Sequence, residues 1–122
     1  MELSNKILSD LTVYMKYAKW KEEDNRKETW EETCNRNMEM HLKKFEEHGT
    51  SFAEEIVNVY QNYVIPRKIL PSMRSMQFGG KPIELSPNRL YNCAYMPVDS
   101  VECFHEAMFL LLGGTGVGYS VQ

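Results

Sequence analysis

A cysteine within an apolar run is the first residue of this sequence whose type could do chemistry. Cys93 lies in the run 90–98, which is predicted to be a strand, so its side chain could point into a barrel or a cleft. A buried cysteine is more often a small apolar residue without chemistry. Redox chemistry would need a second thiol nearby, and the sequence supplies none at a suitable spacing. The inert and the redox interpretations of Cys93 therefore both stay open on this pattern alone.

The cysteines and histidines together give no metal-site pattern. The cysteines are three in number and widely spaced, without a CxxC pair, which favours reduced thiols over a disulfide framework or a zinc ribbon. The histidines have no ligand spacing with one another or with the cysteines. Each is predicted to lie on a helix surface: His41, His48 and His105. We therefore expect no metal bound by this chain.

A loop with two hydroxyls and a guanidinium could hold phosphate oxygens. Ser72, Arg74 and Ser75 provide these groups in a segment that neighbouring prolines make rigid. Helix capping and salt bridging would explain the same three residues equally well. The loop is therefore a candidate anion site with a structural alternative.

The glycine cluster 113–118 could bring backbone close to a flat ligand. It joins a predicted helix to a predicted strand, whereas phosphate-binding glycine loops run from a strand into a helix. It also lacks the Gly-Lys-Ser/Thr ending of a Walker loop. A helix end with a tight turn is the alternative interpretation.

Three amphipathic helices are predicted in a helical amino-terminal region, 1–64. Their apolar residues recur at intervals of three and four positions. The predicted ranges are 9 to about 23, 28 to 48, and 51 up to Pro66. Gly49 is expected to end the second helix, and Ser51 with Glu54 has the pattern of a capping box that opens the third.

The second region, 65–122, is predicted to be a connector followed by a strand, a helix and a strand. Prolines and a Gly-Gly pair interrupt residues 65–87 too often for a long helix. The apolar runs 90–98 and 117–121 flank a helix that Ser100 is expected to cap. Such a unit normally places its two strands in parallel, so the fold class is α/β.

The composition of the chain is that of a globular protein. The last quarter of the chain is poor in charged residues. The chain has 122 residues, of which 43% are hydrophobic and 25% charged, with a formal net charge of -3. Without a basic cluster or a long apolar run, neither a nucleic acid nor a membrane is expected as a partner, and a cytoplasmic location is expected.

Residues 90–122 contain no lysine or arginine. A segment so apolar belongs in a large core, and two parallel strands cannot bury themselves. The chain is therefore expected to be incomplete, the alternative being a helical domain with a two-stranded appendage.

Four segments in order resemble the start of the ribonucleotide reductase catalytic chain, most closely its adenosylcobalamin-dependent, class II form. Residues 17–20 with 26–33 are similar to the amino-terminal helices of that family, and 70–74 resembles its early substrate-phosphate loop. Residues 92–100 resemble the strand with its first redox cysteine, and 113–121 its glycine-rich turn beside the substrate base. An oxygen-dependent relative with a separate radical-generating subunit is the alternative class.

The resemblance implies a role for five residues. Cys93 would help to expel the ribose 2′-hydroxyl as water and then share a disulfide with a partner cysteine. Ser72 would hydrogen-bond the substrate phosphates, and Asn92 would help to shape the ribose pocket. Thr115 and Gly116 would lie against the nucleobase through backbone contacts. The substrate would be a ribonucleoside diphosphate or triphosphate, and an external dithiol such as thioredoxin would restore the thiols.

The resemblance also implies that this chain is inactive alone. The fold would be an incomplete piece of a ten-stranded α/β barrel, without the nucleotide-binding cone that controls activity in some relatives. The thiyl-radical cysteine, the disulfide partner of Cys93 and most of the adenosylcobalamin site would belong to a carboxy-terminal chain or segment beyond Gln122. A split enzyme, an interrupted gene product and a truncation would share this sequence. The alternative of a different class is a non-catalytic module that associates with a complete reductase.

Overall fold

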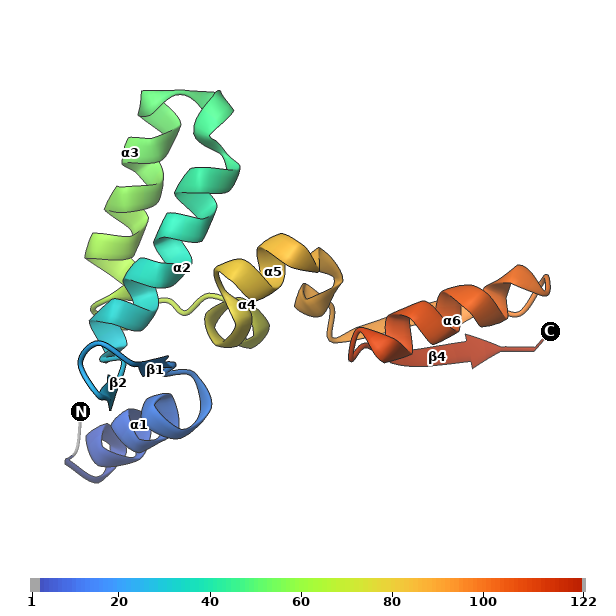
Figure 1. Ribbon diagram of the computed structural model, residues 1–122, viewed down its shortest axis with the longest axis horizontal. Coiled ribbons are helices and arrows are strands. Elements are labelled where there is room, and N and C mark those ends of the chain that lie inside the picture. The colour runs from blue at the N-terminus through green and yellow to red at the C-terminus, as the bar shows by residue number, and fades with distance from the viewer. Residues whose placement is uncertain (1–2, 122) are drawn as a thin grey trace. The chain divides into compact units, whose positions relative to one another are not determined.

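The computed structural model describes residues 3–121 and shows a helix-rich chain with two small sheets (Figure 1). The chain divides into two compact units, residues 1–80 and 81–122. The mixed α/β class is therefore confirmed, and the first unit holds part of the predicted connector as well as the helical region. Among the described residues, no helix combines the length and the apolar character that crossing a membrane requires.

The first unit opens with a helix and a two-stranded hairpin, where the sequence predicted one helix over 9–23. Helix α1 spans Leu3–Lys16, and the antiparallel pair β1 (Trp20–Lys21) and β2 (Arg26–Lys27) follows it. The prediction was wrong beyond Lys16 because the chain reverses at Asn25, whose φ of 49° is tolerated best by asparagine, aspartate and glycine.

Helix α2 spans Trp30–Lys44 and begins with a capping box. The Thr29 side chain accepts a hydrogen bond from the Glu32 backbone N–H, and the Glu32 carboxylate accepts one from the Thr29 N–H at 2.7 Å. A short 3-10 turn, η1 (Glu46–His48), then leads to Gly49, which has a φ of 86°. The second helix therefore ends before Gly49, at Lys44 with Phe45 as its C-cap, and the predicted end at Gly49 is wrong for α2; Gly49 ends the 3-10 turn instead.

Helix α3 spans Thr50–Val59 and continues as a π-helical turn, η2 (Tyr60–Val64). Figure 1 shows α2 and α3 side by side, and the structure records direct contacts between them. The predicted capping box of Ser51 and Glu54 is wrong: Gly49 is the N-cap, and no side chain caps the helix. The left-handed Gly49 starts the helix early, which places Ser51 inside its first turn.

The core of the first unit is built from α2, η2 and the short helix α4 (Met73–Phe78). Its buried apolar residues are Cys34, Tyr60, Val64 and Met76. Trp30 packs against this cluster and donates its indole N–H to the Ile65 carbonyl at 2.9 Å. His41 lies on α2 as predicted, and its side chain is half-buried there. Burial lowers the pKa of His41.

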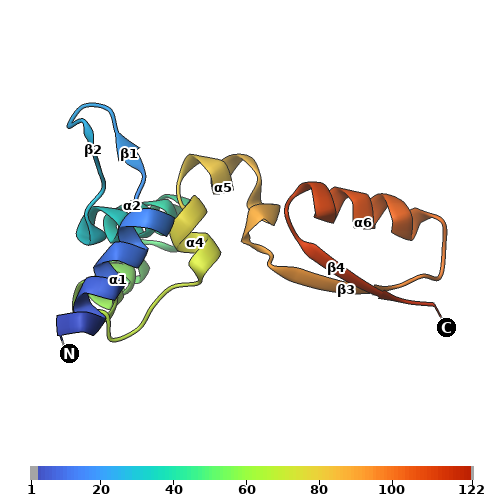
Figure 2. The same ribbon diagram turned by 90° about the horizontal axis from the view of Figure 1, so that it is seen from below.

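The second unit contains the predicted strand, helix and strand. It begins with the short helices α5 (Lys81–Leu85) and η3 (Pro87–Leu90), which confirms that prolines exclude a long helix here. Strand β3 (Cys93–Pro97), helix α6 (Glu102–Leu112) and strand β4 (Gly116–Ser120) follow. The strands are parallel, as predicted, and Figure 2 shows α6 running alongside both. Val101 is the N-cap of α6, so the predicted Ser100 cap is wrong.

Candidate functional site

Cys93 and Gly116 lie side by side at the start of the parallel β3–β4 pair. They are register partners, and the Gly116 N–H donates to the Asn92 carbonyl at 3.0 Å. Register partners of parallel strands present their side chains on the same face. Cys93 and Gly116 are both exposed, and the Cys93 thiol is free. The cysteine thus lies beside a position without a side chain, where a flat ligand could rest on the backbone.

The same exposed face continues along the strands. Tyr95 and Gly118 are the next register partners on it, and the Tyr95 ring is 69% exposed. The Tyr95 hydroxyl and the Ser120 hydroxyl are 2.7 Å apart and share a hydrogen bond. We call this face, which carries Cys93, Tyr95, Gly116, Gly118 and Ser120, the open sheet face. It combines one thiol, one aromatic ring and a bare glycine strip.

Thr115 holds the turn that leads into β4. It is 2% exposed, and its backbone N–H donates to the Leu110 carbonyl at 2.9 Å. Its hydroxyl donates a long hydrogen bond of 3.4 Å to the Tyr91 carbonyl. These contacts tie the end of α6 and the segment before β3 to the start of β4. Thr115 is therefore a buried residue that holds the turn in place, and Gly116 beside it is exposed.

Helix α6 covers the opposite face of the two strands. Cys103 is the buried residue of this helix, at 6% exposed, while Ala94, Met96 and Val117 are half-buried at the positions that alternate with the open sheet face. Gly113 ends the helix against the Asn88 side chain, so closely that a Cβ there would meet the amide nitrogen at 2.2 Å. Helix α6 thus covers most of this face, although Tyr119 near the end of β4 is 69% exposed on it.

Ser72 occupies the turn before α4 in the first unit. It is exposed, and its hydroxyl accepts a hydrogen bond from the Ser75 N–H at 3.2 Å as the N-cap of the helix. The structural alternative, helix capping, is therefore present in the molecule. An N-cap oxygen has further lone pairs, so capping does not prevent Ser72 from donating its own hydroxyl proton to an anion.

The carboxyl end of α4 is fixed by a charged cluster from α2 and the hairpin. Arg36 donates to the Gly79 carbonyl at 2.8 Å and to the Met76 carbonyl at 3.2 Å, and the Lys19 ammonium donates to the same Gly79 oxygen at 2.8 Å. Arg36 also pairs with Glu28 at 2.8 Å. Burial alone would raise the pKa of the Glu28 carboxyl, but the hydrogen bonds from Arg36 and its other donors outweigh this effect and lower it.

The structure brings together four of the five residues that the resemblance singled out. Asn92, Cys93, Thr115 and Gly116 meet at the amino end of the β3–β4 pair, while Ser72 belongs to the other compact unit. Gly118 lies in the glycine cluster 113–118 but was given no role of its own from the sequence. Its spacing of two residues from Gly116 places both glycines on the same sheet face. Among residues 3–121, no group of three or more histidine, cysteine or acidic side chains could hold a metal ion.

Comparison of the chain with family models, with curated proteins and with solved structures found no match. The function is therefore argued from the site itself.

Proposed function

We propose that this chain is the amino-terminal part of a ribonucleotide reductase and supplies one of its two reducing thiols. The observation that carries the proposal is the pairing of an exposed Cys93 with the side-chain-free Gly116 on the open sheet face. A reducing thiol has to be accessible to its substrate, as the exposed Cys93 is. The side-chain-free backbone at Gly116 would let a flat nucleobase lie beside the thiol. An inert cysteine would instead be buried, as Cys34 and Cys103 are.

The proposed reaction removes one oxygen from the substrate. A radical on the further polypeptide activates the ribose, and the 2′-hydroxyl leaves as water. Cys93 and a partner cysteine together supply two electrons and two protons, and their sulfurs form a disulfide. An external dithiol such as thioredoxin then reduces that disulfide. Atoms and electrons balance because two thiols become one disulfide as one ribonucleotide becomes one deoxyribonucleotide and water.

The other proposed roles follow from position. The backbone of Thr115 and Gly116 would contact the nucleobase. Gly116 is exposed and has no side chain, and the buried Thr115 immediately before it holds the turn. Asn92 would help to shape the ribose pocket next to Cys93, and its carbonyl already fixes the start of β4. Ser72 would donate its hydroxyl to the substrate phosphates, which are those of a ribonucleoside diphosphate or triphosphate.

The surface of the second unit supports the need for a further polypeptide. Within residues 3–121, β3 and β4 pair only with each other, so each leaves one edge open. Parallel sheets are normally buried on both faces. Helix α6 is also apolar away from the sheet, with outward residues that are 55 to 81% exposed: Phe104, Met108, Phe109, Leu111 and Leu112. Helix α6 also carries the polar residues Glu102, His105 and Glu106, but so many exposed large apolar side chains on one helix usually mark a surface that contacts another part of a protein.

We propose that the further polypeptide, a second chain or another segment, adds strands to both edges and completes a ten-stranded barrel. It would also contain the thiyl-radical cysteine and the disulfide partner of Cys93. Adenosylcobalamin is the proposed radical source. Adenosylcobalamin is large, and an exposed face of two strands could contact only one side of it. The further polypeptide would therefore hold most of this cofactor. The reduced cysteines fit a cytoplasmic location.

A non-catalytic assembly module is the second candidate, because the same apolar surface of α6 and the open strand edges would suit it. The two candidates differ in their need for the Cys93 thiol. A module that binds a complete reductase would do so equally well without this sulfur.

The test is ribonucleotide reduction by the chain together with the product of the coding region immediately downstream, with adenosylcobalamin and a dithiol. We expect turnover when the two polypeptides are mixed and none from either one by itself. This turnover should be lost in Cys93→Ser. The matched control is Cys103→Ser, which changes the buried thiol of α6 and should retain activity. Turnover that survives in Cys93→Ser would reject the catalytic role and favour the assembly module.

A further inference from the structure

A buried asparagine on α2 contacts the turn that carries Ser72. The Asn37 side chain is fully buried. Its amide nitrogen donates to the Ser75 carbonyl at 2.7 Å and to the Ser75 hydroxyl at 2.8 Å. Its amide oxygen accepts a hydrogen bond from the Tyr60 hydroxyl. Because one end of the amide is held by acceptors and the other by a donor, its orientation is fixed.

Ser75 passes this constraint on to Ser72. The Ser75 N–H donates to the Ser72 hydroxyl oxygen at 3.2 Å, and the Met76 N–H donates to the Ser72 carbonyl at 3.1 Å. A continuous chain of hydrogen bonds therefore runs from Tyr60 through Asn37 and Ser75 to Ser72. It joins three segments that are far apart in the sequence.

The π-helical turn η2 brings Tyr60 to this chain. Tyr60 is the first residue of η2, and its carbonyl accepts the Ile65 N–H at 2.9 Å in the wider turn. The Tyr60 ring belongs to the buried core, and burial raises the pKa of its hydroxyl to about 12. The hydroxyl is therefore protonated at neutral pH and able to donate to Asn37.

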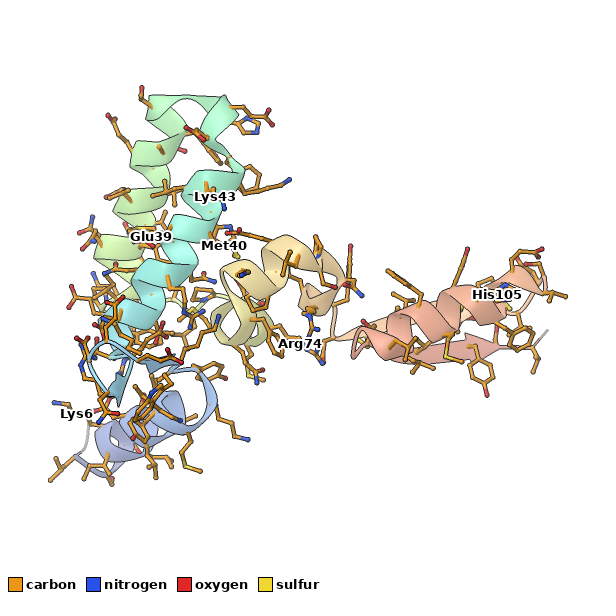
Figure 3. All side chains as sticks on the ribbon, in the orientation of Figure 1. Lys6, Glu39, Met40, Lys43, Arg74 and His105 are labelled. Carbon is orange, nitrogen blue, oxygen red and sulfur yellow. The ribbon has the colours of Figure 1, made fainter. Side chains whose placement is uncertain are left out.

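The neighbouring residues of α2 hold the other end of α4. Arg36 and Lys19 both donate to the Gly79 carbonyl, and the Gly80 N–H contacts the Met40 sulfur at 3.3 Å. Figure 3 shows Met40 on the side of α2 that faces α4. A six-residue helix has little stability of its own. Its position is thus determined by α2 at both ends.

We propose that Asn37 and Tyr60 are positioning residues for Ser72, which hold its hydroxyl and the following backbone in the geometry that receives the substrate phosphates. This inference rests on the proposed function of Ser72 and adds residues that do not touch the substrate. Tyr60 acts through Asn37, and Asn37 acts through Ser75.

Tyr60→Phe tests the chain of hydrogen bonds with the least disturbance, because the ring stays in the core and only the donor is removed. The matched control is Tyr63→Phe, which removes a hydroxyl from a half-exposed ring in the same π-helical turn. Hydrogen exchange of the full chain should be faster at the Ser75 and Met76 amides in Tyr60→Phe and unchanged in Tyr63→Phe. Equal protection of these amides in both variants would overturn the positioning role.

Steady-state kinetics of the assembled enzyme test the consequence for substrate. We expect Tyr60→Phe to raise the KM for ribonucleotide about tenfold while kcat changes little, since phosphate contacts bind the ground state and the transition state alike. A lowered kcat at unchanged KM would contradict the inference. If the wild-type mixture shows no reduction, the proposed function fails, and hydrogen exchange alone still decides whether Tyr60 and Asn37 position Ser72.

Discussion

Gly116 lies directly opposite Cys93 in the parallel β3–β4 register, and its N–H donates to the Asn92 carbonyl at 3.0 Å. The hydrogen bond fixes the glycine beside the cysteine, and the absence of a Cβ leaves the backbone next to the thiol bare. Gly116 therefore affects the fold through its backbone hydrogen bond and would affect a ligand through its lack of a side chain. Mutation can distinguish these two effects.

Gly116→Ala should leave the fold intact and impair the ligand site. A Cβ at this position would lie 3.7 Å from the Asn92 carbonyl oxygen, an ordinary contact, and alanine is at least as compatible with a strand as glycine. We expect the free energy of unfolding to change by less than about 1 kcal/mol. In the assembled enzyme, the KM for ribonucleotide should rise about tenfold, since the methyl group would occupy the ligand side. Thermal unfolding and steady-state kinetics measure the two effects.

Cys93 should be the fast-reacting thiol of the native chain. It is exposed, whereas Cys34 is 0% and Cys103 6% exposed, and burial raises the pKa of Cys34 to about 12. A colourimetric thiol reagent should label one thiol rapidly in the wild type and three after denaturation. Cys93→Ser should remove the rapid phase, and Cys103→Ser should retain it. A rapid phase that persists without Cys93 would show that another cysteine is accessible.

Gly79→Ala should destabilise the first unit. A Cβ there would lie 2.7 Å from the Ser75 carbonyl oxygen and 2.9 Å from the Asn37 amide nitrogen, so both would have to move. The expected loss is about 2 to 3 kcal/mol in chemical denaturation.

Gly49→Ala is the control for that substitution. Gly49 has a φ of 86° and a ψ of 176° but nothing within 4 Å of the added Cβ, so its replacement should cost backbone strain alone, about 1 to 3 kcal/mol, without a steric clash. A loss of less than about 1 kcal/mol in Gly79→Ala would mean that α4 does not pack against α2 as described.

The first unit should lose stability in acid partly through Glu28. The pKa of this carboxyl in the folded chain is lowered from its usual value of 4.5, so the unfolded chain takes up a proton first as the pH falls. Its stabilising effect is complete above 4.5 and is lost as the pH falls through the lower, folded pKa. Glu28→Gln should therefore flatten the dependence of unfolding on pH as the pH falls below 4.5.

Glu23→Gln serves as the control, because Glu23 is exposed. Some acid sensitivity should remain in Glu28→Gln, since the hydrogen bond from Arg26 also lowers the pKa of Glu32. If the acid transition of Glu28→Gln coincides with that of the wild type, the Arg36–Glu28 pair does not contribute as described.

The parts of the fold that follow from local patterns could be predicted from the sequence. The apolar runs on either side of α6, each bounded by turn residues, predicted the β3 and β4 pair and its parallel direction. Gly49 marked the end of the 3-10 turn rather than the end of α2, because α2 already stops at Lys44. The β1–β2 hairpin was missed because its two-residue strands are too short to show an alternating pattern, and Asn25 alone marks the turn.

The support of the candidate site depends on contacts between distant residues, which no local pattern reveals. Asn37 is polar and fully buried because Ser75 satisfies its amide from 38 positions away. Thr29 with Glu32 and Ser51 with Glu54 share the same capping-box pattern, but only the first pair forms the capping box. The exposure of Cys93 could not be predicted, since it depends on which sheet face α6 covers.

The most direct measurement of the central claim follows the Cys93 sulfur through a single turnover. The chain and its downstream partner would be reduced, freed of external dithiol and given ribonucleotide and adenosylcobalamin. Peptide mapping by mass spectrometry would then report the state of each cysteine. We expect a disulfide between Cys93 and a cysteine of the partner, formed in proportion to deoxyribonucleotide, while Cys34 and Cys103 stay reduced. Deoxyribonucleotide formed while Cys93 remains a free thiol would contradict the account.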